Sequence, residues 1–188
     1  MSGPDPIRIA EGDPQSVPQW ARLRHALWPE ASLEEHRREA LSILEDPDGG
    51  VAFLAHLDGH GPVGFAEASL RRDYVNGCST SPVAFLEGLY VAPPHRRRGI
   101  ARRLVQAFEA WAKAKGCREM ASDADLSNTV SHAMHEALGF EETERVCISG
   151  SRSALGTAPE PGPITTCRGR RAPRRTCGSG PTADRRPC

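Results

Sequence analysis

The stretch "VAFLEGLYVAPPHRRRGIARRL", Val83 to Leu104, joins an apolar run to a turn with five arginines around Gly99. The apolar run predicts a strand, and apolar side chains at helical spacing predict a helix from the turn to about Lys115. A helix that begins at such a turn has free N–H groups and partial positive charge at its start. Because Gly99 and Ala101 are small, a phosphate can approach the backbone closely. The turn therefore predicts a pyrophosphate cradle, with a nucleic-acid patch or a solvated helix start as alternatives.

Charge is distributed unevenly along the 188 residues, although 24 Lys and Arg balance 24 Asp and Glu. Up to Ile148 there are 16 basic and 22 acidic residues, a net of −6, and from Ser149 onward 8 arginines face 2 acidic residues. An acidic domain attracts cationic partners and repels nucleic acid on average. We therefore expect no nucleic-acid partner, and the arginine-rich turn and tail keep that alternative open.

Composition divides the chain into a domain over residues 1–148 and a disordered tail over 149–188. The tail contains six Pro, six Gly and no aromatic residue, so it cannot build a core. No run approaches the roughly 18 apolar residues of a membrane span, and the N-terminus lacks an apolar signal region. We expect a cytoplasmic protein without a membrane partner. The six cysteines lack a Cys-x-x-Cys pair and are expected to be free thiols, with a zinc site in the tail as a weak alternative.

Strand and helix patterns alternate along the domain, which favours an α/β sandwich. Two local signals are specific: Ser32 with Glu35 forms a capping-box pattern, and Gly88 inside a strand predicts a β-bulge. The predicted strands span residues 7–11, 51–57, 63–71, 85–91, 117–123 and 140–148. The predicted helices span residues 20–28, 32–44, 100–115 and 128–138.

The pattern Arg96-x-x-Gly99-x-Ala101 after an apolar strand resembles the coenzyme A pyrophosphate motif of the GNAT N-acetyltransferases. More narrowly, "DYVNGC", "FLEG", "GCREMASD" and "ALGFEETERV" resemble the aminoglycoside 6′-N-acetyltransferases, over about residues 7–146. The resemblance implies an α/β GNAT fold. Its mixed, mostly antiparallel sheet is splayed at the strand before the coenzyme turn, with helices on both faces. It also implies direct acetyl transfer from acetyl-CoA to the 6′-amine of aminoglycoside antibiotics, conferring resistance, with no metal.

The resemblance also implies which residues bind the two substrates. In GNAT folds, backbone groups of the splayed strand pair with the pantetheine arm, and the turn holds the pyrophosphate. The residues implied for acetyl-CoA are Leu89, Tyr90, Val91, Arg97, Arg98, Gly99, Ile100, Ala101, Arg102 and Asn128. Those implied for the aminoglycoside are Trp28, Tyr74, Glu87, Asp123 and Glu144. Three carboxylates in the second set suit a polycation.

The reaction needs a base for the amine and a proton for the departing thiolate. Glu87 lies beside the thioester-binding strand and is the candidate base, directly or through water. His135 stands where many GNAT enzymes have a proton-donating Tyr, so the proton donor is His135, Tyr90 or solvent. Cys117 is expected to be a packing residue rather than an acyl-enzyme nucleophile.

The resemblance ends at Val146, where family members continue with a short aromatic and basic strand ending. One codon choice for Cys147–Ser151, shifted by one base, encodes His-Phe-Arg-Lys. We therefore hypothesise that a frameshift produced the tail, and DNA sequencing across codons 145–152 tests this. The alternatives are an inactive frameshifted product or an N-acetyltransferase for another amine, such as a polyamine or a peptide N-terminus. Family members also imply a homodimer.

Overall fold

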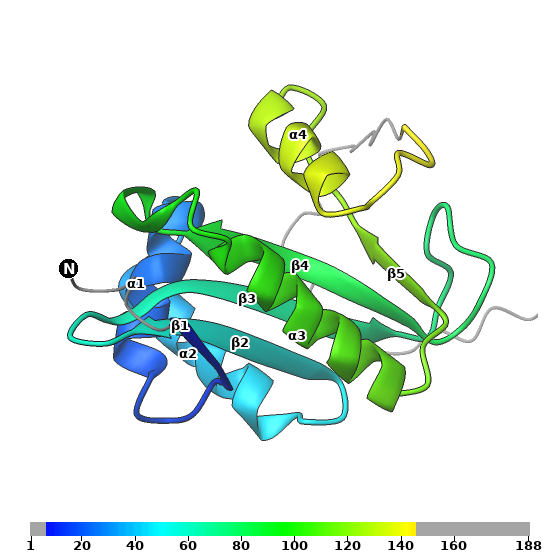
Figure 1. Ribbon diagram of the computed structural model, residues 1–188. Coiled ribbons are helices and arrows are strands. Elements are labelled where there is room, and N and C mark those ends of the chain that lie inside the picture. Colours follow the sequence, from blue (N-terminus) through cyan, green and yellow to red (C-terminus); the bar gives the residue numbers. More distant parts are fainter. Residues whose placement is uncertain (1–6, 146–188) are drawn as a thin grey trace, which may run out of the picture. The chain divides into compact units, whose positions relative to one another are not determined.

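The computed structural model describes residues 7–145; the predicted tail, with its three cysteines, lies outside the described residues. The elements in chain order are β1 (Ile7–Glu11), α1 (Val17–Leu27), α2 (Leu33–Glu45), β2 (Gly50–Leu57), β3 (Gly61–Arg71), β4 (Val83–Val91), the 3₁₀ turn η1 (Pro93–His95), α3 (Ile100–Ala114), β5 (Glu119–Ser122) and α4 (Thr129–Ala137) (Figure 1). Within the described range, no helix is long and apolar enough to cross a membrane.

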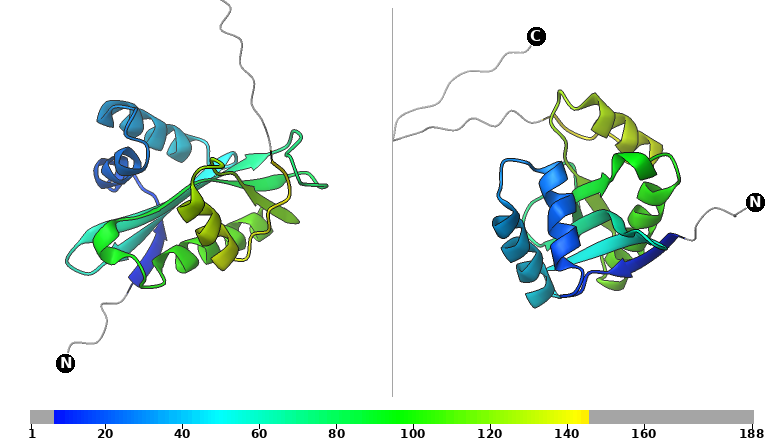
Figure 2. Two further views of the ribbon diagram at one scale, coloured as in Figure 1. Left: turned by 90° about the horizontal axis from the view of Figure 1, so that it is seen from above. Right: turned by 90° about the vertical axis from the view of Figure 1, so that its left-hand side faces the viewer.

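The five strands form one sheet in the order β1-β2-β3-β4-β5. The first three pairings are antiparallel, and β4 pairs with β5 in parallel. Helices α1 and α2 lie on one face of the sheet, and α3 and α4 lie on the other (Figure 2). The predicted α/β sandwich with a mixed, mostly antiparallel sheet is thus confirmed.

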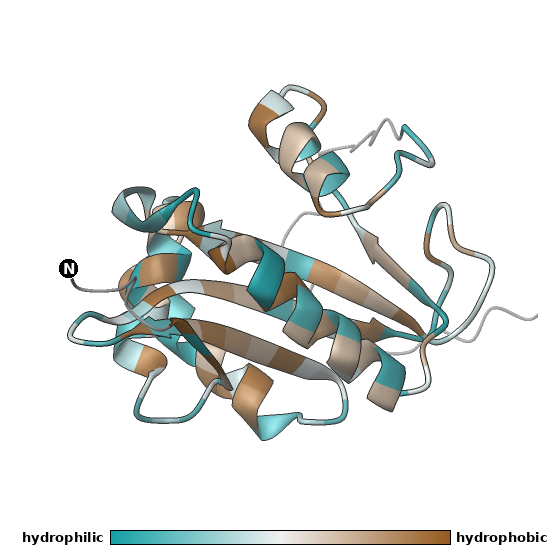
Figure 3. Cartoon of the chain, viewed as in Figure 1, coloured by the Kyte–Doolittle hydropathy of each residue, from teal (hydrophilic) through white to brown (hydrophobic). Residues whose placement is uncertain are grey.

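Each face of the sheet buries its own apolar cluster. On one face, α3 places Ile100, Leu104 and Phe108 at four-residue intervals against the strands, and none is more than 2% exposed. On the other face, Trp20 of α1 packs in the same cluster as Phe65 of β3, and both are fully buried. Apolar residues run along the central strands, whereas much of the surface of α3 is polar (Figure 3). Burial of these regularly spaced apolar side chains fixes the helices to the sheet.

The capping box predicted for the start of α2 is present. The Ser32 hydroxyl accepts the Glu35 N–H at 3.2 Å, and the Glu35 carboxylate accepts the Ser32 N–H at 2.8 Å. These bonds satisfy two N–H groups that the helix leaves free. They fix the turn between α1 and α2, which lies next to Trp28.

The predicted bulge lies in β4. Glu67 of β3 pairs with Gly88 and Ala68 pairs with Leu86, so Glu87 is the extra residue. On its other side, β4 pairs with β5 only as far as Leu86, opposite Ser122. Beyond that point no strand of residues 7–145 covers this edge of β4. The splay expected before the coenzyme turn is therefore present, and the bulge places Glu87 at the fork.

The strand expected over residues 140–148 is wrong for its described part, because Phe140 to Arg145 form no helix or strand. Phe140 packs against the core beside α3, but the following "EETER" has no apolar residue to bury on a sheet face. A strand at the sheet surface needs such alternation. The rest of the expected strand lies outside the described residues.

The connection between β3 and β4 is held against β5 by one carboxylate. Glu119 accepts the backbone N–H groups of Ser79, at 3.0 Å, and Thr80, at 2.5 Å. Hydrogen bonds from the Thr80 side chain, from the backbone N–H groups of Thr80 and Ser79, and from the Ser79 side chain lower the pKa of Glu119 below its usual 4.5. The same connection carries Tyr74, so its anchoring bears on a predicted substrate residue.

This arrangement predicts how the connection responds to acid. Because the pKa of Glu119 is lowered on folding, its stabilising contribution is complete above pH 4.5 and is lost as pH falls through the lowered pKa. Hydrogen exchange of the Ser79 and Thr80 amides should show greater protection in the wild type than in Glu119→Gln at neutral pH. That difference should shrink in acid. A difference that stays constant down to pH 2 would contradict the prediction.

Candidate active site

Glu87 stands at the bulge with its carboxylate held by two residues of β3. Nη2 of Arg71 lies 2.9 Å from Oε1 and 3.0 Å from Oε2 of Glu87, and the Ser69 hydroxyl donates to Oε1. The Glu87 and Arg71 side chains are each 37% exposed. The carboxylate is therefore oriented by the protein and still open to solvent, which suits a group that takes a proton from a bound amine.

Trp28 and Tyr90 lie on the face of β4 that α1 covers. An added Cβ at Gly88 would lie 2.5 Å from Cη2 of Trp28, so the indole rests directly on the bulge. The Trp28 ring also packs against Phe65, and Phe65 packs against Tyr90, with centroid distances of 5.9 and 6.3 Å. Packing on Phe65 thus places Trp28 and Tyr90 on the same face of the sheet, with Trp28 against the bulge.

A buried charged cluster beneath Trp28 was missed by the sequence analysis. Arg24 is 6% exposed and forms ion pairs with Glu67, which is 3% exposed, and with the Glu39 carboxylate. Nε1 of Trp20 donates to Glu67 at 2.7 Å, and Arg24 lies 4.9 Å from the centre of the Trp28 ring. The sequence contains a weak signal for this cluster, namely a Glu in the middle of the apolar "VGFAEASL".

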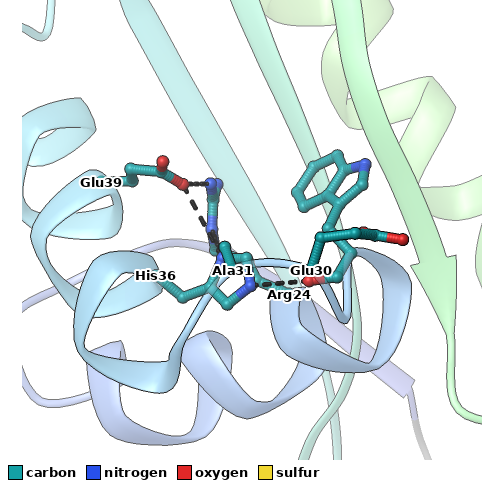
Figure 4. Close-up of a pocket in the computed structure, with 6 residues that line it drawn as sticks. Arg24, Glu30, Ala31, His36 and Glu39 are labelled. Atoms are coloured by element: carbon teal, nitrogen blue, oxygen red, sulfur yellow. Dashed lines mark hydrogen bonds and ion pairs between the residues drawn. The ribbon is translucent and has the colours of Figure 1, made fainter.

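Burial dominates the electrostatics of this cluster. Desolvation raises the pKa of Glu67, against the opposing effects of the Arg24 charge and the hydrogen bonds from Arg24 and Trp20. A hollow of about 320 Å³ opens beside the cluster (Figure 4). Its lining residues are Arg24, Trp28, Glu30, Ala31, His36 and Glu39. The hollow adjoins Trp28 but includes no residue of β4.

The arginine-rich turn combines two left-handed residues with a helix start. Arg97 has φ +64° and Gly99 has φ +79°, and Gly99 is the N-cap of α3. Arg96 donates from Nε to the Val91 carbonyl at 2.8 Å, which ties the turn to the end of β4. Successive N–H groups at such a turn form an anion-binding concavity. Ile100 is predicted to bind acetyl-CoA. Its side chain is 2% exposed and lies in the core, so only its backbone is available for that role.

We predict that Gly99→Ala weakens acetyl-CoA binding about tenfold. A left-handed conformation costs an L-residue about 1–2 kcal/mol, so the alanine chain relaxes the turn and displaces its N–H groups. Gly116 is a matched control: it follows α3 at its other end, also has φ +79°, and likewise has no atom within 4 Å of an added Cβ. Calorimetric titration should show weaker binding for Gly99→Ala alone. Equal affinities for the two variants would contradict the assignment.

Helix α4 is tied to the fork by His135. Nε2 of His135 lies 2.9 Å from the Ser122 hydroxyl, and that hydroxyl donates to the Leu86 carbonyl at 3.1 Å. Nδ1 lies 2.8 Å from the Ser131 carbonyl. Asn128, a predicted coenzyme residue, is the N-cap of α4 and accepts the Ser131 N–H at 3.0 Å. Both nitrogens of the imidazole are therefore engaged by protein groups.

The remaining predicted residues lie apart from this cluster of contacts. Tyr74 is 76% exposed in the connection after β3, Asp123 is exposed directly after β5, and Glu144 is exposed in the segment after α4. No hydrogen bond or ion pair within residues 7–145 joins any of the three to Glu87.

Cys117 packs half-buried against the core, and burial raises the pKa of its thiol. This favours packing over nucleophilic catalysis, since the thiolate is the nucleophile.

Comparison with known proteins gives consistent similarities. The model of the acetyltransferase (GNAT) family matches residues 17–140. An aminoglycoside N(6′)-acetyltransferase type 1 of Serratia marcescens is 53% identical over 145 residues, which are 77% of this chain and 97% of the relative. One of Salmonella typhimurium is 51% identical over 133 residues, 71% of this chain and 90% of the relative.

Solved structures agree with the sequence matches. The aminoglycoside N-acetyltransferase AAC(6′)-Iy in complex with CoA superposes with a TM-score of 0.77 at 44% identity, covering 81% of this chain and 99% of the other. A structure of AAC(6′)-Iy with the bisubstrate analogue CoA-S-monomethyl-acetylneamine gives a TM-score of 0.74 at 46% identity, covering 78% and 99%.

Proposed function

The chain belongs to the acetyltransferase (GNAT) family, and from this premise we propose that it transfers the acetyl group of acetyl-CoA to the 6′-amine of aminoglycoside antibiotics. The observation that carries the proposal is Glu87, which is oriented at the bulge beside the open edge of β4. The high identity to aminoglycoside N(6′)-acetyltransferases over nearly their full length supports the acceptor. Such an activity confers resistance to these drugs.

Acetyl-CoA lies along the open edge of β4 in this proposal. The backbone groups of Leu89 to Val91 pair with the pantetheine arm, and one of their N–H groups polarises the thioester carbonyl. The pyrophosphate rests on the turn of Arg97 to Arg102, where N–H groups and guanidinium groups supply charge-assisted bonds. Asn128 at the start of α4 contacts the coenzyme through the amide nitrogen that its capping bond leaves free.

The aminoglycoside binds on the face of β4 that carries Trp28 and Tyr90. Its 6′-nitrogen attacks the thioester carbon, so an N–C bond forms and the C–S bond breaks. Glu87 takes the proton that the nitrogen loses, and the thiolate takes a proton from a donor of the protein. Further protonated amines of the acceptor pair with Asp123 and Glu144, and Tyr74 supports a sugar face. The net acidic domain favours such a polycation.

Tyr90 is the better candidate for the proton donor, because no described residue hydrogen-bonds its hydroxyl, whereas both nitrogens of His135 are engaged. We predict that Tyr90→Phe lowers kcat about a hundredfold without changing the KM for acetyl-CoA. His135→Gln should keep kcat within about threefold of the wild type. Steady-state kinetics with both variants decide, and the opposite pattern would assign the proton to His135.

Thiol release from acetyl-CoA by the purified chain tests the function. Neomycin carries a 6′-amine and paromomycin a 6′-hydroxyl in its place, so the pair isolates the proposed acceptor group. Release with neomycin alone is expected. Release with spermidine or a peptide instead would indicate another amine acceptor. If acetyl-CoA also failed to raise the melting temperature, the chain would be an inactive product.

A homodimer and a cytoplasmic location remain predictions, and light scattering tests the predicted homodimer.

A further inference from the structure

The carboxylate proposed to serve the substrate amine is already paired with a cation of the protein itself. Arg71 is the last residue of β3, and one of its guanidinium nitrogens bridges both oxygens of Glu87 at 2.9 and 3.0 Å. The guanidinium carbon lies only 3.3 Å from the centre of the Phe85 ring. Ser69 donates to the same carboxylate. The pair is therefore held by a ring, a hydroxyl and the strand end together.

Fold stability does not account for this pair. Both side chains are about one-third exposed, and ion pairs at such positions contribute little to stability. The sheet also offers Glu87 no alternative cation: Arg72, the next residue, is exposed and makes no ion pair within residues 7–145. What the pair does fix is the direction of the Glu87 carboxylate at the fork between β4 and β5.

Resting on the proposed function, we propose that Arg71 is a positioning residue for Glu87, the proton acceptor of the reaction. It orients the Glu87 carboxylate, and its permanent charge cancels the attraction of that carboxylate for a substrate ammonium. A protonated amine is not a nucleophile, so an ion pair between it and Glu87 stabilises only the ground state. Interactions of that kind lower KM without raising kcat. With Arg71 in place, the carboxylate remains available to accept a proton from a neutral amine.

The guanidinium suits this role better than an ammonium group. It is charged at every accessible pH, and its planar shape allows it to stack on Phe85 while one of its nitrogens bridges the carboxylate. A lysine would supply the charge but would lose the stacked geometry. Arg71→Lys should therefore recover the charge effect and only part of the orientation.

Kinetics with matched variants test the inference. In Arg71→Ala, kcat for neomycin should fall about tenfold, because a carboxylate free to move misplaces the proton acceptor. The KM for neomycin should fall or stay the same, since the bare carboxylate binds ammonium groups more tightly. The KM for acetyl-CoA and the melting temperature should not change. Arg72→Ala removes the same charge one residue away and should match the wild type throughout, while Arg71→Lys should recover part of kcat.

Titration calorimetry with neomycin gives a readout that does not require turnover. Arg71→Ala should bind at least as tightly as the wild type, and Arg71→Ala with Glu87→Gln should lose any gain. A raised KM or weaker binding in Arg71→Ala, or a kcat within twofold of the wild type, would overturn the inference. Failure of the proposed function looks different, because the wild type itself would then not turn over neomycin.

Discussion

Glu87→Gln should lower kcat/KM for an aminoglycoside at least about a hundredfold while acetyl-CoA still binds with wild-type affinity. A positioned general base contributes roughly 10²–10⁴ to the rate, and the amide cannot accept the amine proton. Gln keeps the shape of the side chain and an oxygen that accepts from Ser69 and Arg71. The variant therefore removes the base and its charge but leaves the bulge and its hydrogen bonds largely intact.

The measurement is thiol release over a range of aminoglycoside concentrations, with acetyl-CoA affinity measured separately by calorimetry. Glu109→Gln provides the control, since the Glu109 side chain on α3 is 44% exposed and, within residues 7–145, pairs only with Lys113. It changes the net charge by the same amount and should not alter kcat/KM. A Glu87→Gln enzyme with nearly full activity would remove Glu87 from the mechanism and leave solvent as the base.

Local sequence signals were sufficient to predict most of the fold, including the arginine-rich turn at the start of α3. The capping box of Ser32 and Glu35, the bulge at Gly88 and the helix after Gly99 each depend on a few neighbouring residues. The strand expected after Phe140 failed because the segment "EETER" lacks the alternation that a sheet surface requires.

Contacts that depend on register could not be predicted in the same way. The pair of Arg71 and Glu87 exists because β3 and β4 align Arg71 with Val83, which brings the Arg71 side chain within reach of Glu87 on the neighbouring strand. A register changed by one residue would place the Arg71 side chain on the opposite face. Sequence spacing alone does not specify that alignment, so Glu87 was predicted as a base without its partner.

The predicted site residues divide along the same lines. Trp28 and Tyr90 are brought to the bulge by packing on Phe65, which follows from apolar patterns in α1 and β3. Tyr74 and Glu144 lie on segments without regular structure, where backbone hydrogen bonds do not fix the side-chain direction. Their roles rest on family resemblance and remain predictions.

Arg24→Ala should lower the free energy of unfolding by about 3–5 kcal/mol, because it leaves the Glu67 carboxylate buried without its cation. Urea unfolding followed by circular dichroism measures the effect. Arg22→Ala is a matched control on the same helix, since Arg22 is exposed and its side chain makes one hydrogen bond within residues 7–145, to Gln19 at 3.4 Å. It should change the free energy of unfolding by no more than about 0.5 kcal/mol.

The double replacement Arg24→Met with Glu67→Leu separates a charge effect from a packing effect. Apolar residues of similar volume in place of a buried ion pair are often neutral or stabilising. The double variant should therefore recover part of the lost stability, less the cost of about 1–3 kcal/mol for leaving the buried Trp20 Nε1 without its acceptor. The single variant should also show a specific pH dependence. Burial raises the pKa of Glu67 against the opposing charge of Arg24, and Arg24→Ala removes that opposing charge. The folded variant therefore holds a proton that the unfolded chain releases, and its stability falls as pH rises above about 4.5. If the double variant were as unstable as Arg24→Ala, the cluster would owe its stability to side-chain shape rather than to paired charges.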